Sequence, residues 1–354
     1  MSKLTRSEFL RMLALGAGAL AAEPLLSACS EAPEPPTPDQ PLQNIPTARP
    51  RSTTGEQSTP ATEAPQETSP NAEGTSSEAP TTQLTGVPDI AVARGGEPEA
   101  LVRGALAALG GMERFVPKNA SVIIKPNICV AYHTYEYAAT TNPWVVGALV
   151  KACLEAGARS VQVTDFPFGG SAEEAYAISG IQEQVEAAGG EMIYMSNFKF
   201  VNADIPQGQD LKKTKAFGDA LEADVLIDVP IAKHHGLARL TLGMKNLMGL
   251  IQDRGSIHAN LGQRVADLTS LFRPTLTVVD AVRILMNNGP TGGDLGDVKQ
   301  LDTVVISPDI VAADSYATTL FGLHPEDIAY IPAAAAMGLG RNDLSNLKIE
   351  EIAI

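Results

Sequence analysis

Short apolar runs typical of buried strands alternate with helical stretches from Val87 to the end of the chain. Most of the runs end at a proline or a polar residue. Such alternation is typical of a doubly wound, mostly parallel sheet with helices on both faces. We therefore expect one α/β domain over residues 87–354. The predicted strands are residues 89–93, 121–125, 159–164, 191–195, 224–228, 276–280 and 303–307, and the predicted helices are residues 98–109, 143–156 and 172–188.

Ligands of doubly wound sheets bind beyond the carboxyl ends of the strands. Four polar residues end predicted strands or come directly after them: Lys125, Asn127, Asp165 and Asp280. A lysine can pair with an anion and an asparagine can orient a ligand, although Asn127 also suits an ordinary turn. Each aspartate is a candidate base or metal ligand, or a cap for the next element. Beyond Asp280, residues 288–293 form either a lid or a plain surface loop.

The densest group of ionisable side chains follows the predicted strand over residues 224–228. Three of the five histidines and two lysines lie within 26 residues. Imidazole and amine groups together suit acid–base chemistry, anion binding or metal ligation. The alternative is that the histidines satisfy local backbone groups and the lysines are solvated. The glycines and the strand-end position favour a site, which would include Lys233, His234, His235, Lys245, Asn246 and His258.

The start of the helix over residues 143–156 is a second place where an anion could bind. Asn142 has the character of an N-cap there, and Thr140 and Thr141 carry hydroxyls beside it. Asp309 also has the character of an N-cap.

Composition excludes several classes of function. The net charge of −15 argues against nucleic acid as a partner, because phosphate binding requires a basic surface. Cys129 and Cys153 form no C-x-x-C motif, so we expect no cysteine-ligated iron–sulfur cluster in this chain. Whether the two pair in an exported protein stays open. The sequence also lacks the usual glycine-rich motifs of nucleotide sites and serine hydrolases.

Residues 1–29 have the order of a lipoprotein signal peptide: a positive start, a short apolar run and Leu26-Ser-Ala-Cys29. We expect a lipid on Cys29, an exported protein and tethering to the membrane. The segment around Arg6 is similar to a twin-arginine motif, with Ser7 in place of the second arginine. Export by that route or by the general route both stay open. An amphipathic N-terminal helix is the other interpretation.

Residues 30–86 contain few apolar side chains beyond Ala and Pro, with eight acidic residues against Arg49 and Arg51. Such a segment buries too little surface to offset its ordering entropy. We therefore expect a disordered linker that holds the domain away from the membrane.

The motifs taken in order resemble a known family, "domain of unknown function 362", over nearly all of residues 87–340. The resemblance implies the α/β fold, and the family's activity is by its name not established. The family pattern has Lys-Thr-His where this chain has Lys233-His234-His235, so the family position of the histidine stays open. Some relatives carry ferredoxin-like cysteine runs, which this chain lacks. The matching residues are Val122–Asn127, Thr141–Pro143, Ala223-Asp224, Val229-Pro, Lys233, Thr241-Leu, Lys245–Gly249, His258, Asp267, Val279-Asp280, Gly289-Pro290, Ser307–Asp309 and Asp314.

The chain also resembles, more distantly, the nickel-pincer lactate racemase group in the spacing of His235, Lys245 and His258. The resemblance implies a tethered cofactor on Lys245, a metal ligated by His258 and a base at His235. The chain departs from that group in lacking a Gly-Gly-Arg-Lys run and in having Asp165 where another catalytic histidine is expected.

Three functions follow as hypotheses. The first is an extracytoplasmic enzyme that uses a divalent metal or a metal-containing tethered cofactor. The second is a lipid-anchored protein that binds a small anion. The third is an accessory protein to an iron–sulfur redox partner. For the first, we expect His235, Lys233 and Asp165 to be catalytic, Lys245, Asn246, Lys125 and Asn127 to bind the cofactor, and His258, His234 and Asp280 to bind metal.

Overall fold

The computed structural model describes residues 86–354, and this range contains the whole of the predicted α/β domain. The predicted signal peptide, Cys29 and residues 30–85 of the predicted linker lie outside the described residues. Within the described range, no helix has the length and apolar character needed to cross a membrane.

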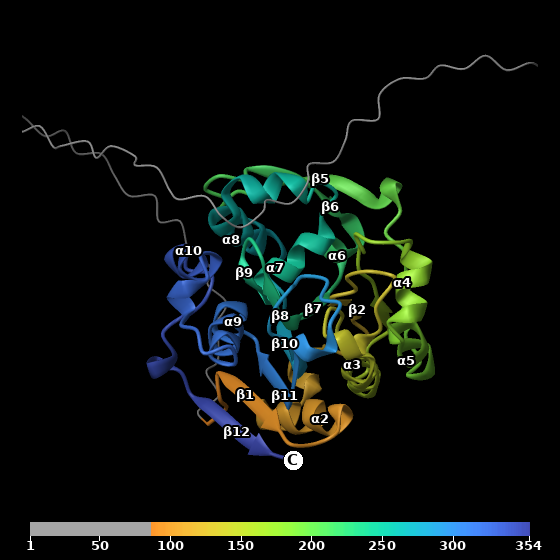
Figure 1. The fold of residues 1–354 in the computed structure, drawn as a ribbon. Coiled ribbons are helices and arrows are strands. Elements are labelled where there is room, and N and C mark those ends of the chain that lie inside the picture. The colour runs from red at the N-terminus through yellow and green to blue at the C-terminus, as the bar shows by residue number, and fades with distance from the viewer. Residues whose placement is uncertain (1–85) are drawn as a thin grey trace, which may run out of the picture. The chain divides into compact units, whose positions relative to one another are not determined.

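A ten-stranded sheet forms the centre of the domain (Figure 1). Its main path has the order β12-β1-β11-β10-β7-β2-β3-β4, and β8 and β9 extend it beside β10. On this path within residues 86–354, β11 alone runs against the other strands. The strands are β1 (Ile90–Arg94), β2 (Ser121–Pro126), β3 (Ser160–Val163), β4 (Glu191–Met192), β7 (Val225–Val229), β8 (Ile231–His235), β9 (Arg239–Thr241), β10 (Leu276–Leu285), β11 (Val298–Ser307) and β12 (Ile349–Ala353), with β5 (Phe200–Asp204) and β6 (Lys213–Phe217) paired in a separate hairpin.

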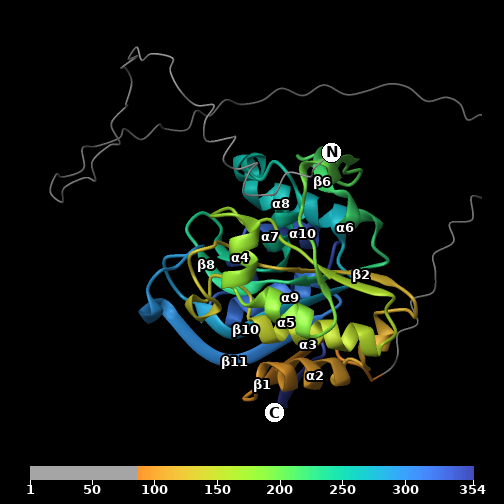
Figure 2. The same cartoon turned by 90° about the vertical axis from the view of Figure 1, so that its right-hand side faces the viewer.

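Helices cover both faces of the sheet, so the predicted doubly wound fold is confirmed. Side chains of β2 alternate between the two faces, as the pleat requires. Val122 and Ile124 pack with α2–α5, whereas Ile123 packs with α6–α10. In Figure 2, α2, α3 and α5 lie low and α6, α7 and α8 lie high. The helices are α2 (Pro98–Ala108), α3 (Pro143–Glu155), α4 (Ala172–Ile178), α5 (Ile181–Ala187), α6 (Gly218–Glu222), α7 (Gly243–Asn246), α8 (Leu261–Phe272), α9 (Ile310–Thr319) and α10 (Tyr330–Ala336).

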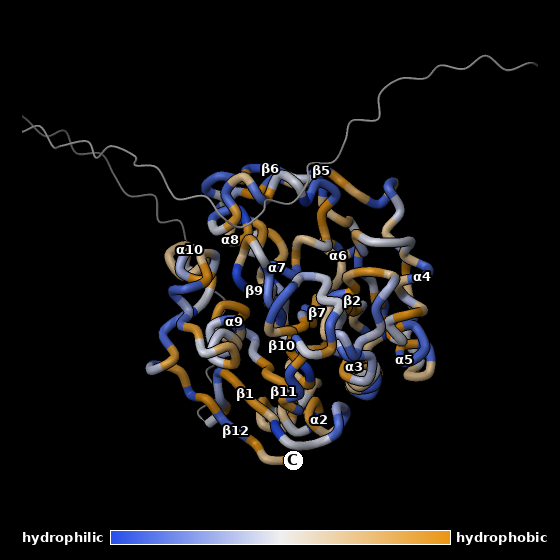
Figure 3. Tube along the Cα trace, in the orientation of Figure 1, coloured by the Kyte–Doolittle hydropathy of each residue, from blue (hydrophilic) through white to orange (hydrophobic). Residues whose placement is uncertain are grey.

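The core explains why these segments form these elements. Hydrophobic residues concentrate along the central strands, and the outer helices alternate between hydrophobic and hydrophilic positions (Figure 3). A strand that is covered on both faces needs apolar side chains on both. β7 meets this need, since all five of its residues are buried. One of the five is Asp228, a carboxylate inside an otherwise apolar strand.

Some predicted bounds were wrong. The helix expected over residues 172–188 is two helices, because Gly180 between them has a left-handed φ of 73°. The strand expected over residues 191–195 has only two residues. The strands expected at residues 276–280 and 303–307 are both longer, because they continue as the antiparallel pair of β10 and β11.

β2 lies where the winding of the chain reverses. From β2 the chain passes through α3 to β3 and β4 on one side, and then returns to β7 on the other side. A crevice opens at such a switch point, because the segments that leave neighbouring strands diverge. The register pairs Lys125 of β2 with Asp228 of β7 at this position. The fold therefore places a ligand site beyond these two residues.

Candidate functional site

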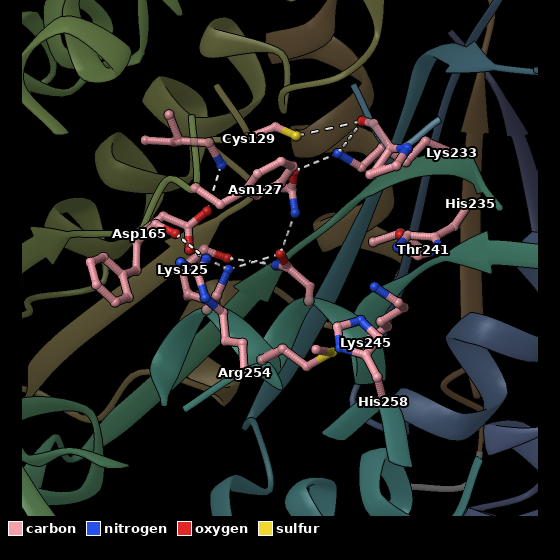
Figure 4. A pocket seen from close by; sticks show the side chains of 17 residues that line it. Lys125, Asn127, Cys129, Asp165, Lys233, His235, Thr241, Lys245, Arg254 and His258 are labelled. Carbon is pink, nitrogen blue, oxygen red and sulfur yellow. Dashed lines mark hydrogen bonds and ion pairs between the residues drawn. The ribbon is translucent and has the colours of Figure 1, made fainter. Parts of the chain in front are cut away.

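A cavity of about 320 Å³ opens at the carboxyl ends of β2 and β3 and beside β8 (Figure 4). Pockets for small molecules have volumes from roughly 300 Å³ upward, so the ligand would be small. Four cationic side chains and one carboxylate line the cavity, together with apolar side chains. The lining residues are Lys125, Asn127, Ile128, Cys129, Asp165, Phe166, Phe168, Lys233, His235, Thr241, Lys245, Asn246, Met248, Gly249, Arg254, His258 and Pro290.

The Lys125 amine is fully held by neighbouring oxygens. It forms an ion pair with Asp165 Oδ1 at 2.8 Å, and it donates to Asn246 Oδ1 and to the Pro126 carbonyl, each at 2.8 Å. The other carboxylate oxygen of Asp165 accepts from the Ile128 amide at 2.6 Å. Lys125 is fully buried. The pair therefore forms a rigid wall of the cavity at the ends of β2 and β3.

Lys233 is held in the same way by three oxygens from two loops. Its amine donates to Asn127 Oδ1 at 2.9 Å, to the Ala139 carbonyl at 2.6 Å and to the Pro290 carbonyl at 3.0 Å. Burial lowers the pKa of Lys233. Because its donors are used by the protein, the amine ties β8 to the loops that follow β2 and β10.

Asn246 connects the two lysine sites. Its Oδ1 accepts from Lys125 and, at 2.9 Å, from Asn127 Nδ2. Its Nδ2 donates to the Lys125 carbonyl at 3.2 Å and to Asp228 Oδ1 at 2.9 Å. The second oxygen of Asp228 has no hydrogen-bond partner in residues 86–354. Burial raises the pKa of Asp228 well above its usual value.

The segment Gly243-Met-Lys-Asn-Leu-Met-Gly249 folds as α7 and a short 3₁₀ turn because its ends pack closely against carboxylates. Asp314 of α9 accepts from the Gly243 amide at 2.7 Å and from the Met244 amide at 2.9 Å. A Cβ at Gly243 would lie 2.9 Å from Asp314 Oδ1, and one at Gly249 would lie 2.2 Å from Asp165 Oδ1. Both positions therefore require glycine.

Lys245 projects from α7 into the cavity and differs from the other two lysines. In the described part of the chain, its amine has no hydrogen bond and no ion pair, although the side chain is only 8% exposed. Burial, followed by repulsion from Lys233, lowers the pKa of Lys245 to about 8, while nearby Cys129 raises it and Arg254 lowers it further. The amine is thus a free donor below that pH and a free nucleophile above it.

His235 is fixed as a neutral hydrogen-bond donor. Its Nδ1 accepts from the backbone amides of Leu237 at 3.1 Å and Ala238 at 3.2 Å. Burial and the nearby Lys245 and Lys233 lower the pKa of His235 to about 3. A neutral imidazole that accepts at Nδ1 carries its proton on Nε2. The ring therefore presents an N–H group, and the role of His235 as a base stays a prediction.

Arg254 and His258 lie near Lys245 at the cavity (Figure 4). The Arg254 guanidinium stacks 4.6 Å from the centre of the Phe166 ring and donates to the Phe166 carbonyl at 2.6 Å. Burial lowers the pKa of Arg254. His258 is exposed, on the 3₁₀ segment Gly255–Asn260.

The rim of the cavity is formed by loops that are joined by hydrogen bonds. The amide of Phe168 donates to the Cys129 carbonyl at 3.1 Å, and the amide of Ala131 donates to the Gly169 carbonyl at 2.7 Å. Cys129 also donates through sulfur to the Pro290 carbonyl at 3.5 Å. The segment that contains Pro290 is therefore part of the rim and contacts the other loops. Cys129 and Cys153 are both buried and both free.

Two residues expected to bind metal lie elsewhere. Asp280 accepts from the amides of Asn142 at 2.6 Å and Val282 at 3.0 Å, and so joins β10 to the start of α3. His234 accepts at Nδ1 from the Gly289 amide at 3.1 Å, and it does not line the cavity. Successive strand residues point to opposite faces, which separates His234 from His235. Residues 86–354 contain no group of three His, Cys, Asp or Glu side chains that could hold a metal ion. The expected set of His258, His234 and Asp280 is therefore not assembled.

At the start of α3, where the sequence suggested an anion site, the polar side chains form hydrogen bonds with other groups of the protein. Asn142 caps the helix by accepting from the Trp144 amide at 3.0 Å, as predicted. Thr141 Oγ1 accepts from the Asn127 amide and donates to the Val229 carbonyl, each at 2.8 Å. Thr140 accepts from the Cys129 amide at 3.3 Å. Asp309 caps α9 through the Ala312 amide, also as predicted.

The sequence analysis missed three polar residues of this region. Arg254 lies in an irregular segment, where neither strand-end position nor spacing marks it. Asp228 could have been found from the sequence, because a carboxylate inside an otherwise apolar strand is unusual. Thr241 lines the cavity with a hydroxyl that has no partner among the described residues.

Comparison with known families matches residues 122–319 to the family described as "Domain of unknown function (DUF362)". The chain belongs to this family. The matched residues run from β2 to α9 and include every residue that lines the cavity.

Two individual proteins are similar to this DUF362 chain. The thylakoid-associated protein sll1697 of Synechocystis is 27% identical over 249 residues, which are 68% of this chain and 75% of that protein. The lactate racemase apoprotein of Thermoanaerobacterium thermosaccharolyticum has a TM-score of 0.38 at 14% identity over 73% of this chain. The match covers 58% of the racemase chain.

Proposed function

We propose that the DUF362 domain of this chain binds a small organic anion through its carboxylate. The observation that carries this proposal is the excess of positive charge at the cavity. Four cationic side chains face one carboxylate, and that carboxylate is already paired with Lys125. The Lys245 ammonium reaches the cavity and has no partner among the described residues, so a bound anion would compensate its charge.

The proposed contacts follow from the groups that the protein leaves free. Lys245 offers an ammonium, and Arg254 offers the planar guanidinium that suits a carboxylate. His235 offers Nε2–H, which can donate to a further oxygen of the ligand. Phe166 and Met248 give the apolar part of the ligand a surface on which to pack.

A panel of small anions tests the proposal by thermal unfolding and calorimetry. Lactate, pyruvate, malate and inorganic phosphate would be compared with neutral glycerol. We expect at least one carboxylate to raise the melting temperature, because a ligand that binds the native state stabilises it. Lys245→Met should lose this effect, whereas Lys118→Met, which changes an exposed lysine, should keep it. Equal stabilisation of the wild type and Lys245→Met would contradict the proposal.

We also propose that the domain works outside the cytoplasm, tethered through a lipid on Cys29. The support is the order of residues 1–29 and the composition of residues 30–86. The ligand would then be a solute at the membrane surface.

A second candidate is an enzyme with a metal-containing cofactor attached to Lys245. The unpartnered amine of Lys245 favours it, and exposed His258 could add a metal ligand. The neutral, Nε2-protonated state of His235 does not fit its expected role as a base. Intact mass and metal analysis of protein purified from its own host test this candidate. Added mass at Lys245 supports it, and an unmodified Lys245 without metal excludes it.

A further inference from the structure

The cavity contains three lysine amines in two different states. Lys125 and Lys233 each contact three oxygen atoms, so all three N–H donors of each ammonium are engaged. Lys245 is nearly as buried, but in the described residues its amine has no acceptor. A buried primary amine that points into a cavity without a partner is the arrangement of a nucleophile that adds to a carbonyl group.

We propose that Lys245 forms an imine with the carbonyl carbon of a 2-oxo acid held in the cavity. This inference rests on the proposed function, because the same site would hold the carboxylate of that acid. It goes further by naming the substrate class and the covalent bond. The carbonyl lies beside the carboxylate in a 2-oxo acid, so one small molecule can reach both Lys245 and Arg254.

The reaction is balanced without an oxidant or a reductant. The neutral amine adds to the carbonyl carbon, and the π electrons of that bond move to oxygen. A proton passes from nitrogen to oxygen, and a second proton on the same oxygen lets it leave as water. The nitrogen lone pair then completes the C=N bond. Starting from the ammonium form, Lys–NH₃⁺ and the carbonyl give a protonated imine and one water.

Neighbouring groups favour this step. His235 presents Nε2–H, which can hold the carbonyl oxygen while the amine attacks the carbon. The low pKa of about 8 leaves about a tenth of the Lys245 amine neutral at pH 7. The Lys125–Asp165 pair stays in place beside the reacting atoms, because each partner has further hydrogen bonds.

Reductive trapping tests the inference. The purified full chain would be incubated with pyruvate and sodium cyanoborohydride, and then analysed by intact mass and peptide mapping. We expect one reduced pyruvyl group per chain, located on Lys245. Lactate, which has the carboxylate but no carbonyl, should compete and should add no mass. Lys118→Met should be labelled like the wild type.

Two variants separate this inference from the proposed function. Lys245→Met should lose both labelling and anion binding. Lys245→Arg keeps a positive charge but has no amine that can form an imine, so it should lose labelling whether or not it binds anions. Stabilisation by anions without labelling of the wild type overturns the imine and leaves the proposed function standing. Labelling spread over Lys125, Lys233 or surface lysines overturns it as well. Labelling of Lys245 without stabilisation by any anion supports the imine and contradicts the carboxylate site.

Discussion

Lys245 makes opposite demands on pH in its two proposed roles. As an anion-binding ammonium it must be protonated, and its pKa of about 8 means that the charge is present below this pH and lost above it. We predict that the affinity for lactate falls as the pH rises from 7 to 9. A charge-assisted hydrogen bond is worth about 1.5–3 kcal/mol, so the loss should approach that range. Calorimetry at both pH values measures it.

The covalent role gives the opposite trend over the same pH range, because the neutral amine attacks the carbonyl. Trapping with pyruvate should therefore become faster from pH 7 to pH 8, while lactate binding weakens. Lys118→Met, which changes an exposed lysine, should show the same fall of lactate affinity as the wild type. A wild-type lactate affinity that is constant from pH 7 to 9 would contradict the part assigned to Lys245.

Because Gly249 has no side chain, the Lys125–Asp165 ion pair can pack directly against its backbone. A Cβ there would lie 2.2 Å from Asp165 Oδ1 and 2.8 Å from the Lys125 amine. We predict that Gly249→Ala destabilises the protein by about 1–3 kcal/mol, as forced overpacking does, and weakens anion binding. Denaturant unfolding measures the first effect.

Gly255→Ala is the matched control, since its added Cβ would meet nothing closer than 3.4 Å. It should unfold like the wild type. Equal free energies of unfolding for Gly249→Ala and Gly255→Ala would contradict this prediction. They would show that the Lys125–Asp165 pair can move away from the added methyl group without loss of stability.

At the scale of single residues, strand-end position was a good predictor of the cavity, and spacing along the chain was a poor predictor of metal ligands. The alternation of a strand sends His234 away from His235, and a capping role engages Asp280. Neither effect is visible until the strand register is known. The residues that sequence analysis named and that line one cavity are Lys125, Asn127, Asp165, Lys233, His235, Lys245, Asn246 and His258.

Helix α7 depends on a carboxylate from another element. It has four residues, and Asp314 of α9 accepts from its first two amides. We predict that Asp314→Asn lowers the free energy of unfolding by about 1–3 kcal/mol, because the new amide group cannot accept both bonds. Chemical denaturation at pH 8 measures it. Unchanged stability would contradict the role of Asp314.

The pH dependence of stability gives a second readout for Asp314. Burial raises its pKa to about 7, above its ordinary value of 3.8. The native state therefore binds more protons than the unfolded state between about pH 4 and pH 7. This group's contribution to stability is full below pH 4 and is lost as the pH rises through 7. Asp314→Asn should remove that contribution to the slope.

At the scale of elements, the sequence predicted the central strands well, because both faces need apolar residues. It missed β8, whose residues include a lysine and two histidines, and β12, an edge strand with exposed positions. β8 forms a hairpin with β9, which was also missed, and pairs with β10, whereas β12 pairs with β1, a partner far along the chain. No local pattern encodes such a partner.

At the scale of the whole molecule, the proposed lipid on Cys29 would decide where the cavity works. We predict that Cys29→Ser moves the protein from the membrane fraction to the soluble fraction of its host, because the lipid acceptor is lost. Fractionation and the mass of the mature N-terminal peptide measure this. Cys153→Ser, which changes a buried cysteine of α3, should leave the location unchanged. Membrane association of Cys29→Ser equal to that of the wild type would contradict the tether.

The cavity has a floor at the strand ends and a rim formed by the loops that follow those strands. The floor is formed by the ends of β2 and β3 and by residues 243–249, which are packed too closely to accept even a methyl group at Gly249. The rim is formed by the loops that contain Cys129, Phe168 and Pro290. If the proposed anion site is correct, changes at exposed positions of these loops would alter ligand selectivity, whereas the backbone groups that hold Lys233 and Asp165 would have to be kept.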